Sequence, residues 1–440
     1  MWCNWIDKLY APCYDAFYMG IPAKERLGNI LEKLNFAIKR FCTIALLFTC
    51  CFYVVYIAGK CPVDICFMVA DLKYNSKQGV KICEIQQASL SLFNGNAFRS
   101  LEEESIHKEL VRILSLYNKN GWVVANPMAD KNVVSALASS SFWQSSQDLI
   151  ALCSNAHFMN QAKQPITDIY DLSSYQGFLY SNWSHLCVID DFEKRFPAMI
   201  VIDKSSFPFW IDKYRMTQLF AEDELLSTFK PKWGNYKKNY TKELAAQIAQ
   251  DLQCDTFVIK PRGEFLGKGV IIIPRQDLDE VLLYIITKSG TLSDSKDPAY
   301  TAWKNDPFDS FIVEEFVASD PIVISHLENK IYQPTMRVAF LLVYNKQCHH
   351  VHFLGGYWKT PLLSLYEDGD FMQKNKDVCK PPYYCAVDAI TMQLVQKELS
   401  IALPLLHARM LQFCSNSQEE FCAPVKKEKI QIVLQEKTIF

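Results

Sequence analysis

Between residues 61 and 205 the apolar positions fall into short runs separated by polar stretches. The runs are rich in β-branched and aromatic residues, as strands are: DICFMVA, VKICEI, GWVVA, GFLYS and AMIVID. One stretch, LEEESIHKELVRILSLY, has its apolar residues at helical spacing instead. The alternation predicts an α/β layer with a mostly parallel sheet over 61–205.

The pattern changes over 206–440, where longer strands follow helices. Helices are predicted at FPFWIDKYRMTQLF, at TKELAAQIAQDL and over a long apolar stretch near the end. Strands are predicted at FVIKP, GVIII, SFIVEEFV, PTMRVAFLLVY and HHVHFLGGYWKTP. Because no repeat or low-complexity linker intervenes, the two regions are expected to abut closely.

Residues 1–60 form a separate N-terminal segment. An amphipathic helical pattern leads into FCTIALLFTCCFYVVYIA, residues 41–58, which carries no charged residue over 18 positions. This length barely suffices to cross a bilayer, so a membrane helix and a buried or membrane-surface helix are both open. If residues 41–58 span a membrane, the basic residues before them place the N-terminal end in the cytosol, and the chain after residue 58 would lie on the opposite side.

Charge and cysteine content narrow the classes of protein. Lys plus Arg number 46 and Asp plus Glu 48, a net charge of -2, which gives no reason to expect nucleic acid as a partner. The 16 cysteines include no Cys-x-x-Cys pair and no Cys/His cluster at zinc-finger spacing. In a chain of 440 residues they indicate reduced, buried thiols. We therefore expect a cytoplasmic protein, with membrane association through 41–58 as an addition.

The stretch FVIKPRGEFLGKGVIII, residues 257–273, is the first that indicates chemistry. Two strand-like runs flank Lys260-Pro261 and a loop that holds Gly263, Gly267, Lys268 and Gly269. A lysine at a strand end, with glycines that let the backbone approach phosphate oxygens, predicts a flap over a polyphosphate. The spacing does not fit a Walker loop, and a glycine hairpin with solvated lysines is the alternative.

Four features in order resemble the ATP-grasp superfamily. They are Asp212-Lys213 at a helix start, Lys260 before the glycine loop, the strand FIVEEFV, and Arg337 on a strand. The resemblance covers 206 to about 415, and it implies a small lobe over about 206–315 and a large lobe over about 316–415. It also makes 61–205 the Rossmann-like domain that precedes the two lobes.

The resemblance further implies ATP as the cofactor and assigns roles to residues. Lys213 and Lys260 would contact the nucleotide, and the glycine loop would cover its phosphates. The adenine hinge would comprise Glu314, Glu315, Phe316 and Val317. Arg337 would face the transferred phosphoryl group, because such transfer depends on positioning and charge neutralisation. A strand arginine paired with a carboxylate is the alternative.

The metal carboxylates of that family, an Asp and then Glu-x-Asn on two late strands, have no counterpart after the last predicted helix. Near the front, however, Asp71 is followed by Glu84 and Gln86. A strand, a turn at Gly79 and a second strand would put Asp71 beside Glu84, with Glu84 and Gln86 on one face. These oxygen ligands suit Mg²⁺, although Gln86 stands where the family has Asn. We therefore expect a circularly permuted arrangement, with the metal hairpin at 64–88; an ordinary edge hairpin is the alternative.

Two further stretches carry candidate groups. Acidic and amide residues crowd LYEDGDFMQKNKD, residues 365–377, which is either a second source of metal ligands or a solvated turn. HFLGGYWKTP supplies Lys359, which either binds a substrate carboxylate or acyl phosphate or is exposed. His350 and His352 share a strand face without a third ligand nearby in sequence, so we expect a solvated strand end.

The resemblance implies an ATP- and Mg²⁺-dependent ligase in which Arg337 and Lys359 act in catalysis. It would join a small-molecule or peptide carboxylate to an amine or thiol through an acyl phosphate, releasing ADP and phosphate. Two alternatives keep the fold: a kinase that phosphorylates a hydroxyl, and a nucleotide-binding module without catalysis. A membrane-anchored interaction protein, based on residues 1–60, is the third.

Overall fold

The computed structural model describes residues 62–88, 103–118, 121–124, 142–145, 176–181, 198–210, 212–264, 267–295, 297–346 and 348–416. The chain divides into two units, Met1–Cys61 and Pro62–Phe440. The first unit, with the apolar segment 41–58, lies outside the described residues. Within the described ranges, no helix is both long enough and apolar enough to cross a membrane. The cysteines in these ranges are free, and their exposure ranges from buried Cys66 to exposed Cys379.

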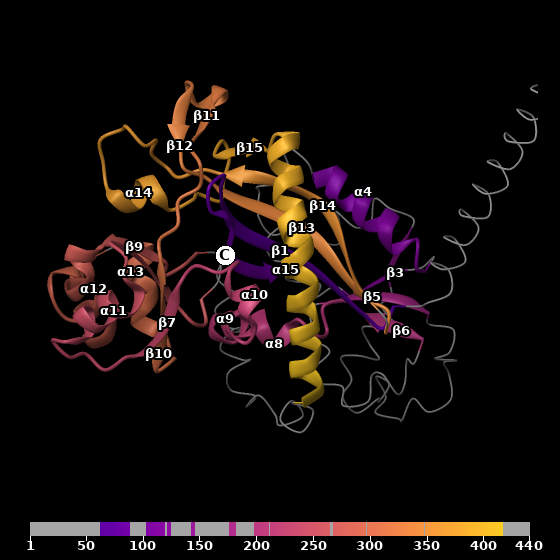
Figure 1. The fold of residues 1–440 in the computed structure, drawn as a ribbon, viewed down its shortest axis with the longest axis horizontal. Coiled ribbons are helices and arrows are strands. Elements are labelled where there is room, and N and C mark those ends of the chain that lie inside the picture. Colours follow the sequence, from indigo (N-terminus) through magenta and orange to yellow (C-terminus); the bar gives the residue numbers. More distant parts are fainter. Residues whose placement is uncertain are drawn as a thin grey trace, which may run out of the picture. The chain divides into compact units, whose positions relative to one another are not determined.

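A five-stranded antiparallel sheet is the core of the second unit, in the order β15-β14-β13-β1-β2 (Figure 1). Its strands are β1 (Asp64–Asn75), β2 (Gly79–Gln87), β13 (Thr335–Tyr344), β14 (His349–Lys359) and β15 (Tyr384–Ala386). Central β1 is buried on both faces, because Ile65 and Phe67 join one apolar cluster and Cys66 and Met68 join another. This double burial explains why ICFMVA, the stretch that follows Asp64, is continuously apolar.

Helices cover both faces of this sheet. The long helix α15 (Ala389–Asn416) runs across one face, where Leu399 and Leu403 pack with Met68 and Phe340 (Figure 1). Three short helices join the same cluster: α8 (Phe207–Trp210), α9 (Lys213–Ala221) and α10 (Glu224–Ser227). Helix α4 (Glu103–Leu114) packs into the other cluster.

A parallel sheet in the order β4-β3-β5-β6 lies beside the first. It comprises β3 (Gly121–Val124), β4 (Trp143–Ser145), β5 (Gly177–Ser181) and β6 (Met199–Val201). A parallel bridge between Ile65 and Ile202 connects it to β1. The sequence predicts a mostly parallel sheet over 61–205, with a hairpin at 64–88. DICFMVA and VKICEI form that antiparallel hairpin, because their three-residue turn is too short for the crossover that parallel strands need.

The remaining elements build a second antiparallel sheet, in the order β7-β10-β8-β9. Its strands are β7 (Trp233–Lys237), β8 (Thr256–Pro261), β9 (Ile271–Pro274) and β10 (Ser310–Glu315). Helices α11 (Leu244–Leu252), α12 (Leu278–Thr287) and α13 (Pro298–Thr301) pack on it around the buried Trp303. A small hairpin of β11 (Ile322–Ile324) and β12 (Lys330–Tyr332) and the short helix α14 (Phe371–Asn375) complete the described elements. The fold class is therefore mixed α/β, as predicted.

Candidate nucleotide and metal site

The β1–β2 hairpin places Asp71 directly opposite Glu84, as the sequence predicts. On its other side β1 pairs with β13, and there Asp71 lies opposite Arg337. The β1–β2 register shifts between Asp71 and Leu72, so that Cys83 has no cross-strand partner. Such a bulge leaves one residue out of the hydrogen-bond ladder, and the Cys83 carbonyl is available to other groups.

Asp71 is the centre of a buried ion cluster. Its two oxygens accept hydrogen bonds from Arg337 Nε at 2.7 Å and Nη2 at 2.6 Å, and Lys359 Nζ lies 2.9 Å away. Burial alone would raise the pKa of Asp71, but the charges of Arg337 and Lys359 outweigh burial and hold that pKa well below its usual range. Lys359 also pairs with Asp377 at 2.6 Å. Neither Arg337 nor Lys359 is therefore a surface cation.

The loop at 365–377, the second predicted source of metal ligands, reaches this cluster through Asp377. Two of its other acidic groups have partners outside the cluster: Glu367 pairs with Lys330 of β12 at 3.0 Å, and Asp370 caps α14 by accepting from Met372 N. The two sources that the sequence leaves open thus meet at Lys359.

Two lysines in or next to the β7-β10-β8-β9 sheet share one carboxylate. Lys260, on β8, and Lys230, just before β7, lie 2.5 and 2.6 Å from the two oxygens of Glu314. Both ammonium groups also donate to the free Cys83 carbonyl, each at 3.0 Å. Burial would raise the pKa of Glu314, but the two lysine charges dominate and lower it. The bulge of the β1–β2 hairpin therefore contacts Lys260 of the β7-β10-β8-β9 sheet and Lys230 just before that sheet.

Lys213 makes the second link between these two parts. Helix α9 begins at Lys213 because Asp212 caps it, accepting from Tyr214 N at 3.0 Å. From this position Lys213 Nζ lies 3.2 Å from Glu84 Oε1 and donates to the Glu264 carbonyl. Gln86 donates its side-chain amide to Glu84 at 2.5 Å, so Glu84 and Gln86 share a face, as predicted.

The glycine loop between β8 and β9 depends on its glycines for its course. Gly267 and Gly269 both have φ of +72°, a conformation that favours glycine. A Cβ on Gly269 would lie 2.6 Å from Pro261, and one on Gly263 would lie 2.4 Å from Phe308. Lys268 is exposed on this loop.

The predicted adenine hinge divides into two parts. The Glu314 side chain faces the lysines and not a base-binding edge. Glu315 instead receives the Lys232 amide at 2.8 Å on its carboxylate, and the amide of Phe316 donates to the Thr256 carbonyl. Phe316 and Val317 are half-buried, so an apolar edge follows the ion cluster along the chain.

Two members of the site, Lys230 and the Cys83 carbonyl, are not among the residues that the sequence predicts. A signal for the lysine is present, because Lys230-Pro231 repeats the Lys260-Pro261 dipeptide. Proline keeps the residue before it extended, which suits a lysine presented from a strand end. The carbonyl gave no signal, because a bulge follows from how the two strands pair.

No protein-family model and no curated protein matches this sequence. Several solved structures resemble the chain, three of them at 9% to 13% identity. The first is a candidate gamma-glutamylcysteine synthetase from Methylobacillus flagellatus KT, with 10% identity, a TM-score of 0.40, and 80% of this chain and 90% of that chain covered. The others are the D-cycloserine synthetase DcsG (13% identity, TM-score 0.33) and D-alanyl-alanine synthetase A from Vibrio cholerae O1 biovar eltor (9%, 0.30), each covering 66% of this chain and 81% of its own.

All three are members of the ATP-grasp superfamily, the family that the sequence motifs resemble.

Proposed function

We propose that this chain is an ATP- and Mg²⁺-dependent ligase that joins a carboxylate to an amine or thiol through an acyl phosphate, releasing ADP and phosphate. One observation carries the proposal: the β1–β2 hairpin contacts the lysines of the glycine-loop sheet. Cys83 accepts from Lys230 and Lys260, and Glu84 pairs with Lys213. Carboxylates for a metal and cations for a polyphosphate therefore meet in one place, as phosphoryl transfer requires.

The proposal gives each sheet a role. The β7-β10-β8-β9 sheet with its glycine loop would be the small lobe, and the five-stranded sheet would be the large lobe. The hairpin at 64–88 pairs with β13 at one edge, although it precedes β13 by about 250 residues in the chain. This pairing is what a circular permutation of the metal hairpin would produce, and it disfavours an ordinary edge hairpin of the parallel sheet.

The donor set fits magnesium. Asp71 and Glu84 are directly opposed across two strands, where Cβ atoms lie roughly 5 Å apart, and Gln86 adds an amide oxygen on the face of Glu84. Mg²⁺ takes one or two such carboxylates together with phosphate oxygens and water, and it neutralises phosphate charge when bound. Arg337 and Lys359 pair with Asp71, and Lys213 pairs with Glu84.

In the ligand-bound state the same cations would change partners. Lys213, Lys230 and Lys260 would hold phosphate oxygens, and the glycine loop would exclude water above them. Arg337, on β13, would face the transferred phosphoryl group and stabilise its negative charge, and Lys359, on the adjacent strand β14, would bind the substrate carboxylate or the acyl phosphate. Both are buried, so their charges act through little solvent.

Calorimetric titration of ATP into the full chain, with and without Mg²⁺, tests the site. We expect Mg²⁺-dependent binding that Glu84→Gln weakens at least about tenfold, or about 1.4 kcal/mol. Glu398→Gln is the matched control. The Glu398 carboxylate, on α15, accepts a hydrogen bond from the backbone amide of Val80 on the same hairpin, away from the cluster. ATP binding that ignores both Mg²⁺ and Glu84→Gln would contradict the metal assignment.

Lys260→Ala separates the nucleotide role from folding. Lys230 still neutralises Glu314 in that variant, so we expect weaker ATP binding with an intact fold. Unchanged ATP affinity in the folded variant would remove Lys260 from the site.

Product analysis then tests the reaction class. The full chain is incubated with MgATP and pooled amino acids, which supply both carboxylates and amines, and with added thiols. A ligase forms ADP and free phosphate together, and only when both substrates are present. ADP with a phosphorylated product and no free phosphate would identify a kinase, and binding without turnover of any pool would favour a non-catalytic module.

A further inference from the structure

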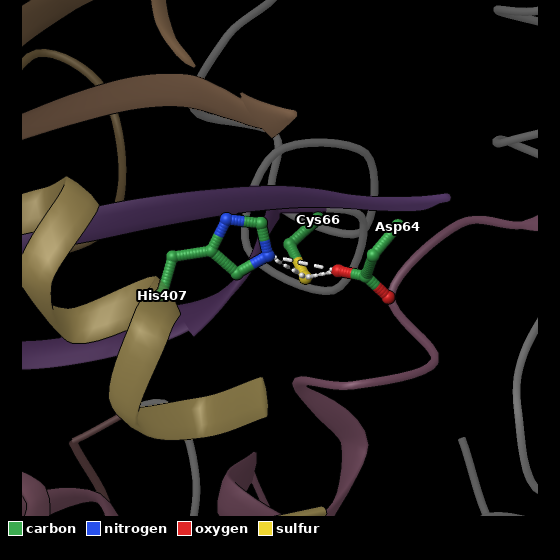
Figure 2. Close-up of side chains that lie close together, drawn as sticks. All are labelled: Asp64, Cys66 and His407. Carbon is green, nitrogen blue, oxygen red and sulfur yellow. Dashed lines mark hydrogen bonds and ion pairs between the residues drawn. The ribbon is translucent and has the colours of Figure 1, made fainter. Parts of the chain in front are cut away.

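A second polar cluster lies at the other end of β1, formed by Asp64 and Cys66 of β1 and His407 of α15 (Figure 2). Asp64 and Cys66 are seven and five residues from Asp71, or roughly 23 and 17 Å along the strand, so the cluster is separate from the proposed nucleotide site. Asp64 is 7% exposed, and Cys66 and His407 are fully buried. Figure 2 shows the carboxylate, the thiol and the imidazole directed toward one point.

Three hydrogen bonds within the cluster converge on one atom. Asp64 Oδ2 lies 2.8 Å from His407 Nε2, 2.7 Å from Ser205 Oγ and 3.4 Å from Cys66 Sγ. A carboxylate oxygen offers about two lone-pair sites, so three donors exceed what this oxygen can accept well. A cation among these groups would satisfy all of them.

Compensating positive charge is also scarce here. Among the described residues, the ion-pair partner of Asp64 is His407, which is charged only when protonated. A second buried carboxylate, Asp203, accepts from the amide of Phe67, the neighbour of Cys66, and from Gln87. Buried carboxylates are normally paired with a cation or a metal.

We propose that Asp64, Cys66 and His407 bind a zinc ion that fastens α15 to β1. Thiolate, imidazole and carboxylate together form a ligand set that selects zinc over magnesium. The three ligand atoms are 2.8, 3.4 and 3.9 Å apart. Tetrahedral zinc with bonds of about 2.0 to 2.3 Å requires separations of roughly 3.3 to 3.6 Å, so shifts of about half an ångström would complete the site.

The surroundings supply the rest of a zinc site. Ser205 Oγ lies 3.1 Å from Cys66 Sγ and closes the cluster on its fourth side, where it or a water would complete the coordination. His407 Nδ1 lies 3.2 Å from His349 Nδ1 on β14. A ligating histidine usually donates its other ring N–H to a fixed partner, and His349 would accept that bond, leaving His407 Nε2 for the metal.

Metal analysis of the full chain tests the proposal. The protein is expressed with added zinc, purified without chelators and measured for zinc per chain by mass spectrometry. We expect one zinc ion in the wild type, falling at least about tenfold in Cys66→Ser and in His407→Gln. The matched control is Cys254→Ser, which removes a half-buried thiol on the other antiparallel sheet and should keep the zinc. Zinc retained in both cluster variants would overturn the proposal.

Cobalt substitution provides a readout that does not need a folded variant. Co²⁺ in the wild-type site should give a thiolate-to-cobalt charge-transfer band and tetrahedral absorption with the intensity of one thiolate, since Cys66 is the one sulfur in the ligand set. A wild-type chain that carries no zinc and shows no such band after incubation with Co²⁺ would overturn the proposal. The cluster would then be a hydrogen-bond network alone.

Discussion

Replacing Glu314 by Gln tests whether the lysine cluster is as strongly coupled as its geometry indicates. The carboxylate of Glu314 lies 2.6 Å from Lys230 and 2.5 Å from Lys260, and all three side chains are nearly fully buried. Glutamine keeps the shape but removes the charge, so two buried ammonium groups would be left with two neutral acceptors, the Cys83 carbonyl and the new side-chain amide oxygen. Breaking a buried ion pair in this way costs about 3–5 kcal/mol.

Deprotonation of the lysines sets an upper limit on this cost. The usual lysine pKa of about 10.4 lies about 3.4 units above pH 7, and each unit corresponds to about 1.36 kcal/mol. Holding one lysine neutral at pH 7 therefore costs about 4.6 kcal/mol. Because the folded variant then binds fewer protons than its unfolded state, its stability rises with pH. The difference from the wild type should therefore shrink as the pH rises from about 7 to about 10.

Urea unfolding of both proteins, followed by tryptophan fluorescence at neutral and alkaline pH, measures this difference. Glu315→Gln is the matched control, because Glu315 is half-buried and its amide oxygen can still accept from Lys232 N. We expect the control to change the unfolding free energy by no more than about 0.5 kcal/mol. A Glu314→Gln loss below about 1 kcal/mol, or one independent of pH, would refute the coupling.

Two further predictions use matched pairs. Gly267→Ala and Gly269→Ala both place alanine at φ +72°, but only at Gly269 does the new Cβ meet Pro261, at 2.6 Å. In thermal unfolding, Gly269→Ala should therefore lower the free energy of unfolding by about 1–3 kcal/mol more than Gly267→Ala. Equal losses in the two variants would contradict this. Burial lowers the pKa of His352. As the pH decreases below about 6.5, the unfolded chain therefore binds a proton at this residue before the folded chain does, and the free energy of unfolding decreases. In urea titrations at several pH values, His352→Gln should reduce this pH dependence of the unfolding free energy, whereas the control His326→Gln, at an exposed position, should not. The same pH dependence in both variants would argue against the prediction.

The sequence predicts those parts of the site that depend on local geometry. Asp71 lies opposite Glu84 because two strand periods and a tight turn at Gly79, with φ of +75°, fix the register. Likewise the cap at Asp212 makes Lys213 the first residue of a helix. Neither prediction needs information from elsewhere in the chain.

Other parts of the site depend on contacts between distant residues. The Cys83 carbonyl meets Lys260 across 177 residues and Lys230 across 147, and it does so through a bulge that breaks the two-residue period. The zinc candidate joins Cys66 to His407 across 341 residues. Searches for metal motifs rely on short spacings, so a pair of ligands on a strand with a third on a remote helix gives no signal.

The burial of β1 links both sites to one physical cause. A strand with apolar clusters on each face has no solvent edge along most of its length, so a charged side chain on it persists only with a buried partner. Three such residues occur, Asp64, Asp71 and Lys73, each no more than 7% exposed. Lys73 donates to the Pro334 carbonyl, and Asp71 pairs with Arg337 and Lys359. Asp64 has only a histidine as its ion-pair partner in the described part of the chain, and the metal proposed there would supply the charge that the strand itself lacks.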